Sequence, residues 1–273
     1  MTKKKELVVK SNRIVEASYR LGLVEQQIIL FAICRSREEQ RGLSPDTPVT
    51  ISAKDFSEQF GTDEKNVYRD LKAAMDTLLT RIVVINDIHP ETGKKRVTKT
   101  HWISTASYID GAGAIQVIFS PRVIPFITRL GESGEFTAYR LEKIACLSST
   151  HAVRMYELLV QYLSIGKREM GIEWLKETLQ VTAEYPRLFD LKKWVIDSSV
   201  AQINAHTDIT TSYTQRKTGR NVTHLNFKID AKESVPKAVK RPSLTRAYVE
   251  KHALPGESWE VARERLRAER TRA

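Results

Sequence analysis

Three side chains that can read the edges of DNA bases lie at helical spacing in the second half of the chain. They are Arg187, Asp190 and Lys193, within a stretch from 182 to 203 that we predict to be a helix. Arginine and lysine donate hydrogen bonds to the guanine edge in the major groove, and a carboxylate accepts one from cytosine N4. The pattern therefore predicts a DNA recognition helix. For a helix considered alone, the alternative is a surface helix whose mixed charges are simply solvated.

The opposite side of this predicted helix is apolar, as packing on a domain requires. At about 100° per residue, one arc collects Leu188, Leu191, Val195 and Ser199, with Ile203 at its edge. Pro186 is expected at the first helical position, where its missing N–H would have no partner within the helix anyway. Lys192 adds a further positive charge beside the outer face.

The composition points to a polyanionic partner. The chain has 273 residues, a formal charge of +11 and a pI near 9.6, and 41% of its residues are apolar, enough for one large or two ordinary domains. Nucleic acid is the first candidate and an anionic membrane surface the second. No apolar run approaches the roughly 20 residues of a spanning helix, and no signal peptide is apparent. We expect a soluble intracellular protein without membrane contact.

No set of residues in the sequence suggests catalysis. The six histidines are scattered without metal-binding spacing, and no GxxxxGK[ST] phosphate loop is present. Gly111 and Gly113 fit a hairpin turn better than a phosphate loop. Tyr185 is expected to pack at the helix entry or to contact a phosphate, while Cys34 and Cys146 are expected to be small core residues in a reducing compartment. The sequence predicts no enzyme activity, no metal and no cofactor.

A helix-turn-helix pattern in the first half would form another DNA-binding unit. A helix near 23–34 and a strand at 49–52 precede a helix at 53–60, which Ser52 caps and Gly61 ends. A longer helix follows at 63–80, with an apolar side formed by Val67, Leu71, Ala74, Met75 and Leu78. Its outer side carries residues suited to phosphate and base contacts, namely Lys65, Asn66, Arg69 and Lys72.

The next two apolar segments are predicted to form a β-hairpin, the wing of a winged helix. They span residues 82–88 and 100–109, and the turn between them contains Lys95, followed by Arg96. A third strand at 114–120 would complete the same sheet. A helix-turn-helix with a basic hairpin beside it is the order of elements in a winged-helix domain.

The same order recurs in the second half of the chain. The predicted elements are a helix at 150–165, a helix at 171–180, the recognition helix, and a hairpin of 209–216 and 221–229. The tip of this second hairpin is basic, with Arg216, Lys217 and Arg220. Two copies of one ordered pattern indicate two winged-helix domains in tandem.

Individual residues support the repeat. Phe56 and Phe60 have counterparts 119 positions further on, at Leu175 and Leu179. The triplet Asp70-Leu71-Lys72 has its counterpart, Asp190-Leu191-Lys192, 120 positions further on, so one extra residue in the second turn reconciles the two offsets.

Over roughly residues 8–230, the sequence resembles the initiator (Rep) proteins of iteron-containing plasmids. The matching stretches are Val9-Lys-Ser-Asn-Arg-Ile14, Leu23-Val-Glu-Gln-Gln-Ile-Ile-Leu30, Phe136-Thr-Ala-Tyr139, Ser148–Tyr162 and Leu191–Asn204. The resemblance implies an α+β fold of two tandem winged-helix domains, each contacting one end of a directly repeated duplex DNA site. It places the base-contacting positions of the family on Arg187, Asp190 and Lys193.

The resemblance also implies partners and regulation. Monomers would initiate replication from the direct repeats with a host replication initiator and helicase in the bacterial cytoplasm. Dimers, joined through the first domain, would repress the protein's own promoter at an inverted repeat. The implied domains are residues 1–135 for dimerisation and DNA contact and 136–230 for the principal sequence-specific binding. Residues 231–273 lie outside the resemblance, and we expect a basic, flexible tail there, with a weak helix over 258–272 as the alternative.

One departure from the family lies in the recognition helix. Where family members often continue a basic run, this chain has Trp194, which we expect to pack against the second wing. Two other functions compete with the initiator. A tandem winged-helix repressor would lack the initiating role, and an origin-nicking enzyme is disfavoured by the absence of paired metal ligands.

Overall fold

The computed structural model describes residues 6–89, 91–109, 111–128, 135–232 and four residues of the tail, without the side chains of Glu64 and Lys65. The chain divides into two compact units, Met1–Lys232 and Glu233–Ala273. The described tail residues (Trp259, Val261, Ala262 and Arg265) are helical. The rest of the tail from residue 233, for which the sequence predicts flexibility, lies outside the described residues.

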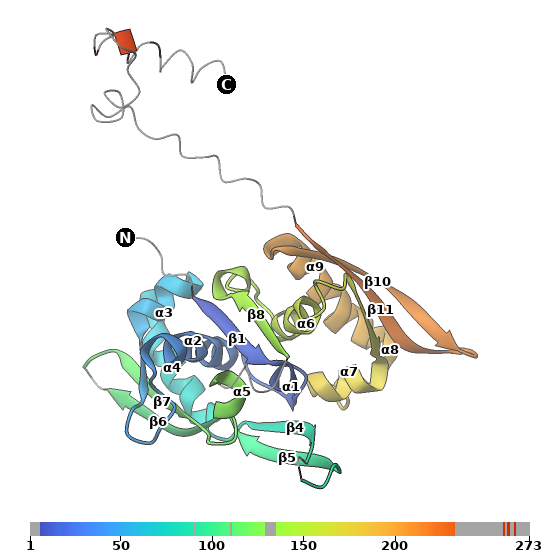
Figure 1. Ribbon diagram of the computed structural model, residues 1–273, viewed down its shortest axis with the longest axis horizontal. Helices are drawn as coiled ribbons and strands as arrows, with labels where there is room; N and C mark the ends of the chain where they lie inside the picture. The colour runs from blue at the N-terminus through green and yellow to red at the C-terminus, as the bar shows by residue number, and fades with distance from the viewer. Residues whose placement is uncertain are drawn as a thin grey trace. The chain divides into compact units, whose positions relative to one another are not determined.

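The first half of the larger unit is a mixture of helices and short strands (Figure 1). Its helices are α1 (Asn12–Val15), α2 (Leu23–Glu39), α3 (Ala53–Phe60), α4 (Glu64–Leu78) and α5 (Ile124–Thr128). Its strands are β1 (Leu7–Ser11), β2 (Ser18–Tyr19), β3 (Val49–Ser52), β4 (Ile82–Ile88), β5 (Lys95–His101), β6 (Ile103–Ile109), β7 (Ala114–Phe119) and β8 (Phe136–Arg140).

The second half repeats the helix-turn-helix and hairpin. Its helices are the 3-10 helix η1 (Leu141–Lys143), α6 (Thr150–Val160), α7 (Ile172–Leu179), α8 (Leu188–Asp190), the π-helix η2 (Leu191–Asp197) and α9 (Ser198–His206). Its strands are β9 (Lys167–Gly171), β10 (Ile209–Thr218) and β11 (Asn221–Ala231).

The first helix-turn-helix agrees with its local sequence signals. The Ser52 hydroxyl accepts a hydrogen bond from the Asp55 amide at 3.0 Å and begins α3. Gly61 ends it with φ +66°, a left-handed conformation that costs glycine little. All the residues of the predicted apolar side of α4 are buried, which confirms the expected orientation of that helix.

The sheets of the first half differ from the prediction. Residues 100–109 are two strands rather than one, because the fully buried Trp102 separates β5 from β6 and packs edge-on against Tyr19 at 4.9 Å between ring centroids. The wing is therefore β4 with β5, and β2 pairs with β4 on the other side. The strand predicted to complete this sheet, β7, pairs instead with β3 and β6 in a separate sheet. Gly111 and Gly113 lie in the β6–β7 turn with positive φ, as predicted.

In the second half, the repeat is regular enough to account for an element that the sequence pattern alone missed. Helix α7 begins and ends 119 positions after α3. Strand β9 runs directly into α7 as β3 runs into α3, and it completes a sheet of order β10-β11-β9. A strand near 168–171 therefore follows from the repeat once β3 is recognised.

The recognition helix is wound differently from the prediction. It begins at Leu188, because the Pro186 carbonyl is engaged by Lys176 Nζ of α7 at 3.0 Å and Arg187 is extended at φ −85°, ψ 136°. Pro186 is thus not the first helical residue. The π-winding of η2 joins residues five positions apart, so Ile196 is as fully buried as Leu191. Of the predicted arc, Leu191, Val195, Ser199 and Ile203 are buried as expected, while Leu188 in the first turn is only half buried.

A buried ionic cluster joins the N-terminal segment to α6. Glu157 of α6 is fully buried and makes an ion pair with Lys10 of β1, whose side chain is 1% exposed. Arg154 donates hydrogen bonds to the carbonyls of Val15 at 2.9 Å and Ala17 at 2.8 Å, and its Nη1 lies 3.3 Å from Glu157 Oε2. Burial alone would raise the pKa of Glu157, but the charges of Lys10 and Arg154 hold that pKa below its usual range.

The N-terminal strand also pairs with a segment from the start of the second half. Residues 136–140 form β8, which runs antiparallel to β1 (Figure 1). Tyr139 of β8 donates a hydrogen bond to Glu157. The boundary predicted after residue 135 therefore falls just before a strand that packs on the first half. Cys34 is buried as expected, but Cys146 is exposed, because the turn before α6 buries Ile144 and Leu147 instead.

We predict that replacing the buried carboxylate destabilises the whole unit. Glu157→Gln keeps the size of the side chain but leaves two buried cations without a counter-charge, which should cost about 3–5 kcal/mol. Urea unfolding followed by circular dichroism measures this change. Glu142→Gln is the matched control, because Glu142 is half exposed with Arg140 at 3.6 Å, and it should stay within about 0.5 kcal/mol of wild type. Equal effects of the two substitutions would contradict the role of Glu157.

Candidate nucleic-acid interface

Of the three side chains predicted to read bases, Asp190 and Lys193 lie on the second recognition helix, and Arg187 is the extended residue just before its first turn. Arg187 and Lys193 are exposed, and Asp190 is half buried. Neither Arg187 nor Lys193 makes an ion pair with any residue that the structure describes, so both charges are free for a ligand. The apolar side packs on the domain core, which fixes the direction of these side chains.

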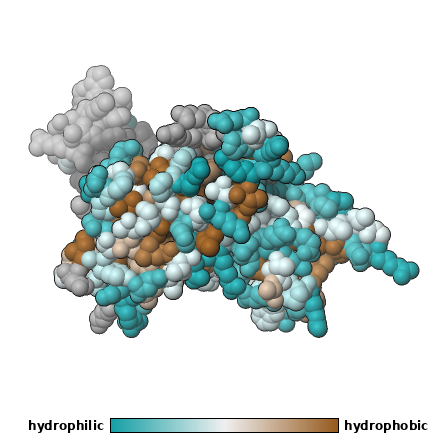
Figure 2. Space-filling model, turned by 90° about the horizontal axis from the view of Figure 1, so that it is seen from below, coloured by the Kyte–Doolittle hydropathy of each residue, from teal (hydrophilic) through white to brown (hydrophobic). Residues whose placement is uncertain are grey.

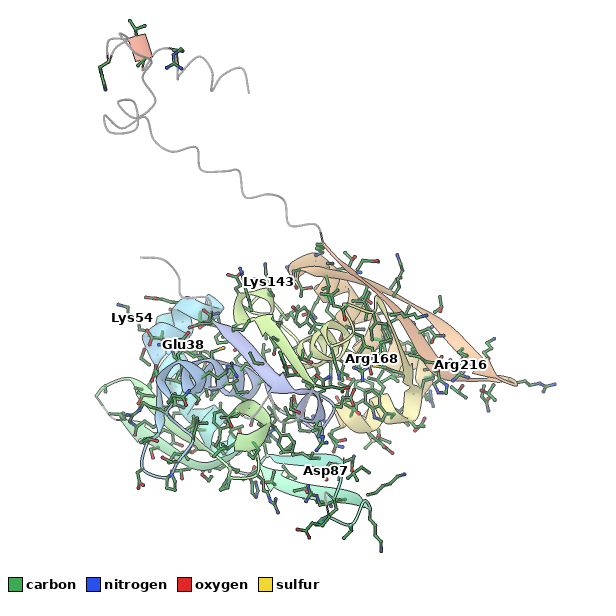
Figure 3. The ribbon with its side chains drawn as sticks, viewed as in Figure 1. Glu38, Lys54, Asp87, Lys143, Arg168 and Arg216 are labelled. Carbon is green, nitrogen blue, oxygen red and sulfur yellow. The ribbon has the colours of Figure 1, made fainter. Side chains whose placement is uncertain are left out.

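The second wing presents its positive charges unequally. Strands β10 and β11 project as a long hairpin that ends at a turn with Gly219 at φ +63° and has hydrophilic side chains at its tip (Figures 1 and 2). Arg216 lies on this hairpin (Figure 3) and donates two hydrogen bonds to Glu169 of β9, at 2.9 Å and 3.1 Å. Lys217 and Arg220 are exposed and make no ion pair within the described chain.

The helix and the wing are joined by a tyrosine that the sequence did not single out. The Tyr213 hydroxyl of β10 donates a 2.6 Å hydrogen bond to Asp197 of η2, and burial together with this bond raises the pKa of Tyr213. Lys192 Nζ lies 6.0 Å from the centre of the same ring. Lys192 thus lies toward the wing. Trp194, which we predicted to pack against the wing, does not. Its side chain is 56% exposed and lies under the ammonium of Lys193 at 4.7 Å.

The first recognition helix, α4, also has a polar outer face. Asn66, Arg69 and Lys72 are exposed, and the side chain of Lys65 lies outside the described residues. Arg69 makes a surface ion pair with the neighbouring Asp70 at 3.2 Å. Lys72 Nζ lies 5.0 Å from the ring centre of Tyr108 on β6, which directs it along the sheet.

The first wing has the same division of roles as the second. Arg96 of β5 donates two hydrogen bonds to Asp87 of β4, at 2.8 Å and 2.5 Å, and these bonds lower the pKa of Asp87 (Figure 3 labels Asp87). Lys95 is exposed at the end of the strand and makes no ion pair with described residues. In each wing, one arginine therefore holds the strands together, while a lysine next to it is free.

The predicted DNA-binding residues are divided between the two halves, each set belonging to a recognition helix and its wing. Sequence reasoning missed the carboxylates that engage the wing arginines, because Glu169 lies 47 positions from Arg216 in the chain. It also missed the exposure of Phe189, which is 71% accessible on the recognition helix. Within the described residues, no three potential metal ligands come together. The same residues include no helical segment suited to spanning a lipid bilayer.

The two halves of the larger unit each contain a helix-turn-helix followed by a β-hairpin, and this arrangement defines a tandem winged-helix protein. The family described as "Initiator Replication protein, WH1" matches residues 7–160, and "Initiator Rep protein, WH2" matches residues 171–229. The chain therefore belongs to the initiator Rep protein family, which confirms the resemblance and the fold drawn from the sequence.

Three known proteins are similar to this chain. An uncharacterized 27.6 kDa protein of Escherichia coli is 22% identical over 226 residues, which span 80% of this chain and 92% of that protein. The Pi initiator protein, crystallised in complex with iteron DNA, superposes with a TM-score of 0.66 at 19% identity, over 85% of this chain and all of that one. The WH1 domain of MSBI1.176, a replication protein isolated from a multiple sclerosis patient, is 33% identical with a TM-score of 0.35, over 41% of this chain and 85% of that domain.

Beside the entry to the recognition helix, His151 and Tyr185 pack edge-on, 6.3 Å apart between ring centres. Tyr185 is thus a packing residue at the helix entry, one of the two roles expected for it. Burial lowers the pKa of His151; nearby Glu184 opposes this shift, and Arg20 adds to it. Arg20 and Glu184 are themselves paired at 2.7 Å, which joins the end of β2 to the loop before the helix.

We predict that protonation of His151 destabilises the fold. Because its pKa is lowered in the folded state, the unfolded state binds the proton more strongly, and stability falls as the pH drops through about 6.5. His151→Gln should therefore flatten the loss of stability between about pH 7.5 and 5.5 in urea unfolding. His206→Gln, at an exposed position at the end of α9, should keep the wild-type slope. Identical slopes in all three proteins would show that His151 does not titrate in this way.

Proposed function

We propose that this protein is a plasmid replication initiator that binds duplex DNA repeats at the origin as a monomer. It then promotes opening of the origin and recruits a host replication initiator and helicase. The observation that carries this proposal is the second recognition helix, where Arg187 and Lys193 are free of ion pairs among the described residues and flank Asp190. Membership of the initiator family and the iteron complex of the Pi protein support the same ligand class.

In this proposal the two winged helices divide the work. Residues 136–230 supply the principal sequence-specific contacts, because Lys217 and Arg220 at the wing tip add phosphate-binding charges to those of the helix. Residues 1–135 supply further contacts through Asn66, Arg69 and Lys95, and they also hold the surface for self-association. The net charge of +11 favours binding to DNA and makes the affinity dependent on salt concentration.

Self-association would convert the initiator into a repressor of its own promoter. Strand β5 is at the edge of its sheet, and an unpaired edge is a ready template for a second copy. Three large apolar side chains of the same hairpin are exposed, Ile82, Ile88 and Val97, at 50%, 52% and 63%. A dimer joined here would bind an inverted repeat, and the monomer would remain free for the direct repeats.

The first prediction from this proposal concerns base reading. Arg187→Ala should weaken binding to the specific repeat by about 1–3 kcal/mol and relax discrimination at one base pair, because a guanidinium paired with guanine is lost. Lys217→Ala should instead weaken binding to all duplexes about equally and reduce the salt dependence, since a lysine at a hairpin tip meets phosphate. Gel-shift titrations on specific and scrambled duplexes at two salt concentrations measure both effects. Unchanged specific binding by Arg187→Ala would overturn the assignment.

The second prediction concerns the balance of monomer and dimer. Val97→Glu places like charges at a two-fold interface and should weaken dimerisation by roughly tenfold or more in sedimentation. Origin-dependent plasmid maintenance should then rise while repression of the promoter falls, because one population grows at the expense of the other. Ile165→Glu is the control, since Ile165 is 60% exposed but lies outside the first hairpin. Parallel loss of both outputs would mean that the dimer is the initiating form.

The same plasmid-maintenance assay separates the initiator from a repressor without initiating role. A repressor would lower transcription from its promoter but would not maintain an origin plasmid in cells. A nicking enzyme would instead produce open circles from supercoiled origin DNA in the presence of Mg²⁺.

A further inference from the structure

Two large aromatic side chains stand exposed on the second recognition helix. Phe189 is 71% accessible and Trp194 is 56% accessible, although aromatic side chains are normally buried in a folded domain. They are not remnants of the buried face, since Leu191, Val195 and Ile196 already close the core beneath the helix with no exposure at all. The two rings therefore require an explanation outside the packing of this domain.

The winding of the helix brings the two rings onto one side. In a regular α-helix, residues five positions apart point in directions roughly 140° apart. The π-helical segment η2 contains Trp194 and begins two residues after Phe189, and its hydrogen bonds join residues five positions apart. This winding turns Trp194 back toward the side that carries Phe189. Asp190 and Lys193 lie between the two aromatic residues in the chain, so the apolar and polar groups share one outer face.

The positive charges of the helix and of the wing identify the kind of partner. Lys193 Nζ lies 4.7 Å from the Trp194 ring, and Arg187 precedes Phe189 by two residues. Lys217 and Arg220 on the wing add two further cations without ion pairs in the described chain. An apolar protein surface would have to desolvate these charges without compensation, whereas duplex DNA supplies phosphates for the cations and, in the major groove, an apolar group for the rings.

We propose that Phe189 and Trp194 read thymines in the repeat through their C5 methyl groups. The inference rests on the proposed function, in which this helix enters the major groove. The thymine methyl is the apolar feature of the major-groove code, and it lies beside the guanine and cytosine groups that the polar residues can bond. The face thus combines polar side chains that select guanine or cytosine with aromatic side chains that select thymine.

The proposal predicts a methyl-specific contribution to affinity. Deoxyuridine pairs as thymidine does but lacks the C5 methyl, so replacing a contacted thymine should weaken wild-type binding about fourfold, the effect of one buried methyl-sized group. In Phe189→Ala or Trp194→Ala, the same thymine-to-uracil change should have little further effect, because the ring that contacts the methyl is gone. The two changes should therefore be non-additive at the affected position.

The experiment begins with selection of a duplex site from a random library by the full-length wild-type protein. Each thymine of the selected site is then replaced singly by deoxyuridine, and binding is measured for wild type, Phe189→Ala and Trp194→Ala. Ile165→Ala is the control, because it removes an apolar side chain that is 60% exposed outside the recognition helix. It should respond to every uracil as wild type does. Thermal unfolding of each variant confirms that the exposed substitutions leave the fold intact.

The outcomes distinguish this inference from the proposed function. If no thymine-to-uracil change weakens wild-type binding, or if every variant responds equally, the aromatic residues do not read methyl groups. In that case a strong effect of Arg187→Ala on the same site would leave the proposed function standing. If selection yields no specific site, or Arg187→Ala binds it as well as wild type, the proposed function itself fails.

Discussion

The carboxylate of Glu157 is the interaction on which the arrangement of this protein depends. Three of its partners come from stretches that carry the family resemblance: Lys10 from Val9–Ile14, Tyr139 from Phe136–Tyr139, and Arg154 from the stretch that holds Glu157 itself. A fourth, Tyr19 of β2, donates a 3.4 Å hydrogen bond. None of these groups is exposed to solvent or placed to meet DNA. Part of the resemblance is therefore carried by a joint inside the protein.

This cluster connects the two winged-helix domains directly, so they are not joined by a linker alone. Helix α6 binds the N-terminal segment through Arg154 and Glu157. It also contacts α9 and η2 of the second domain. Arg168 strengthens the connection, since it donates to the Leu158 carbonyl at 2.6 Å and pairs with Glu16 at 2.6 Å (Figure 3 labels Arg168). Buried charges tolerate few alternative arrangements, because a cation separated from its partner would remain desolvated.

The sequence best predicted the features that depend on residues close together in the chain. The bounds of α3 followed from Ser52 and Gly61, and the buried side of α4 followed from its spacing. What it missed depends on distant contacts or unusual winding. Burial of Trp102 against Tyr19 divides the strand predicted at 100–109 into two. The π-helix η2 changes which residues share the buried face of the recognition helix. Most of the predicted site residues that the structure describes are exposed, although Asp190, Lys192 and Arg96 are half buried. The hydrogen bonds of Arg96 and Arg216 could not be predicted without knowing which strands pair.

The pairing of Arg216 with Glu169 has a consequence for the thermodynamics of recognition. Glu169 lies in β9, which continues directly into α7, so the pair ties the wing to the first helix of the helix-turn-helix. A hairpin held in this way loses less conformational entropy when it meets a ligand. Part of the ordering that a free hairpin would undergo on DNA is then completed during folding. Under the proposed function, the guanidinium of Arg216 therefore contributes to affinity by preorganising the wing.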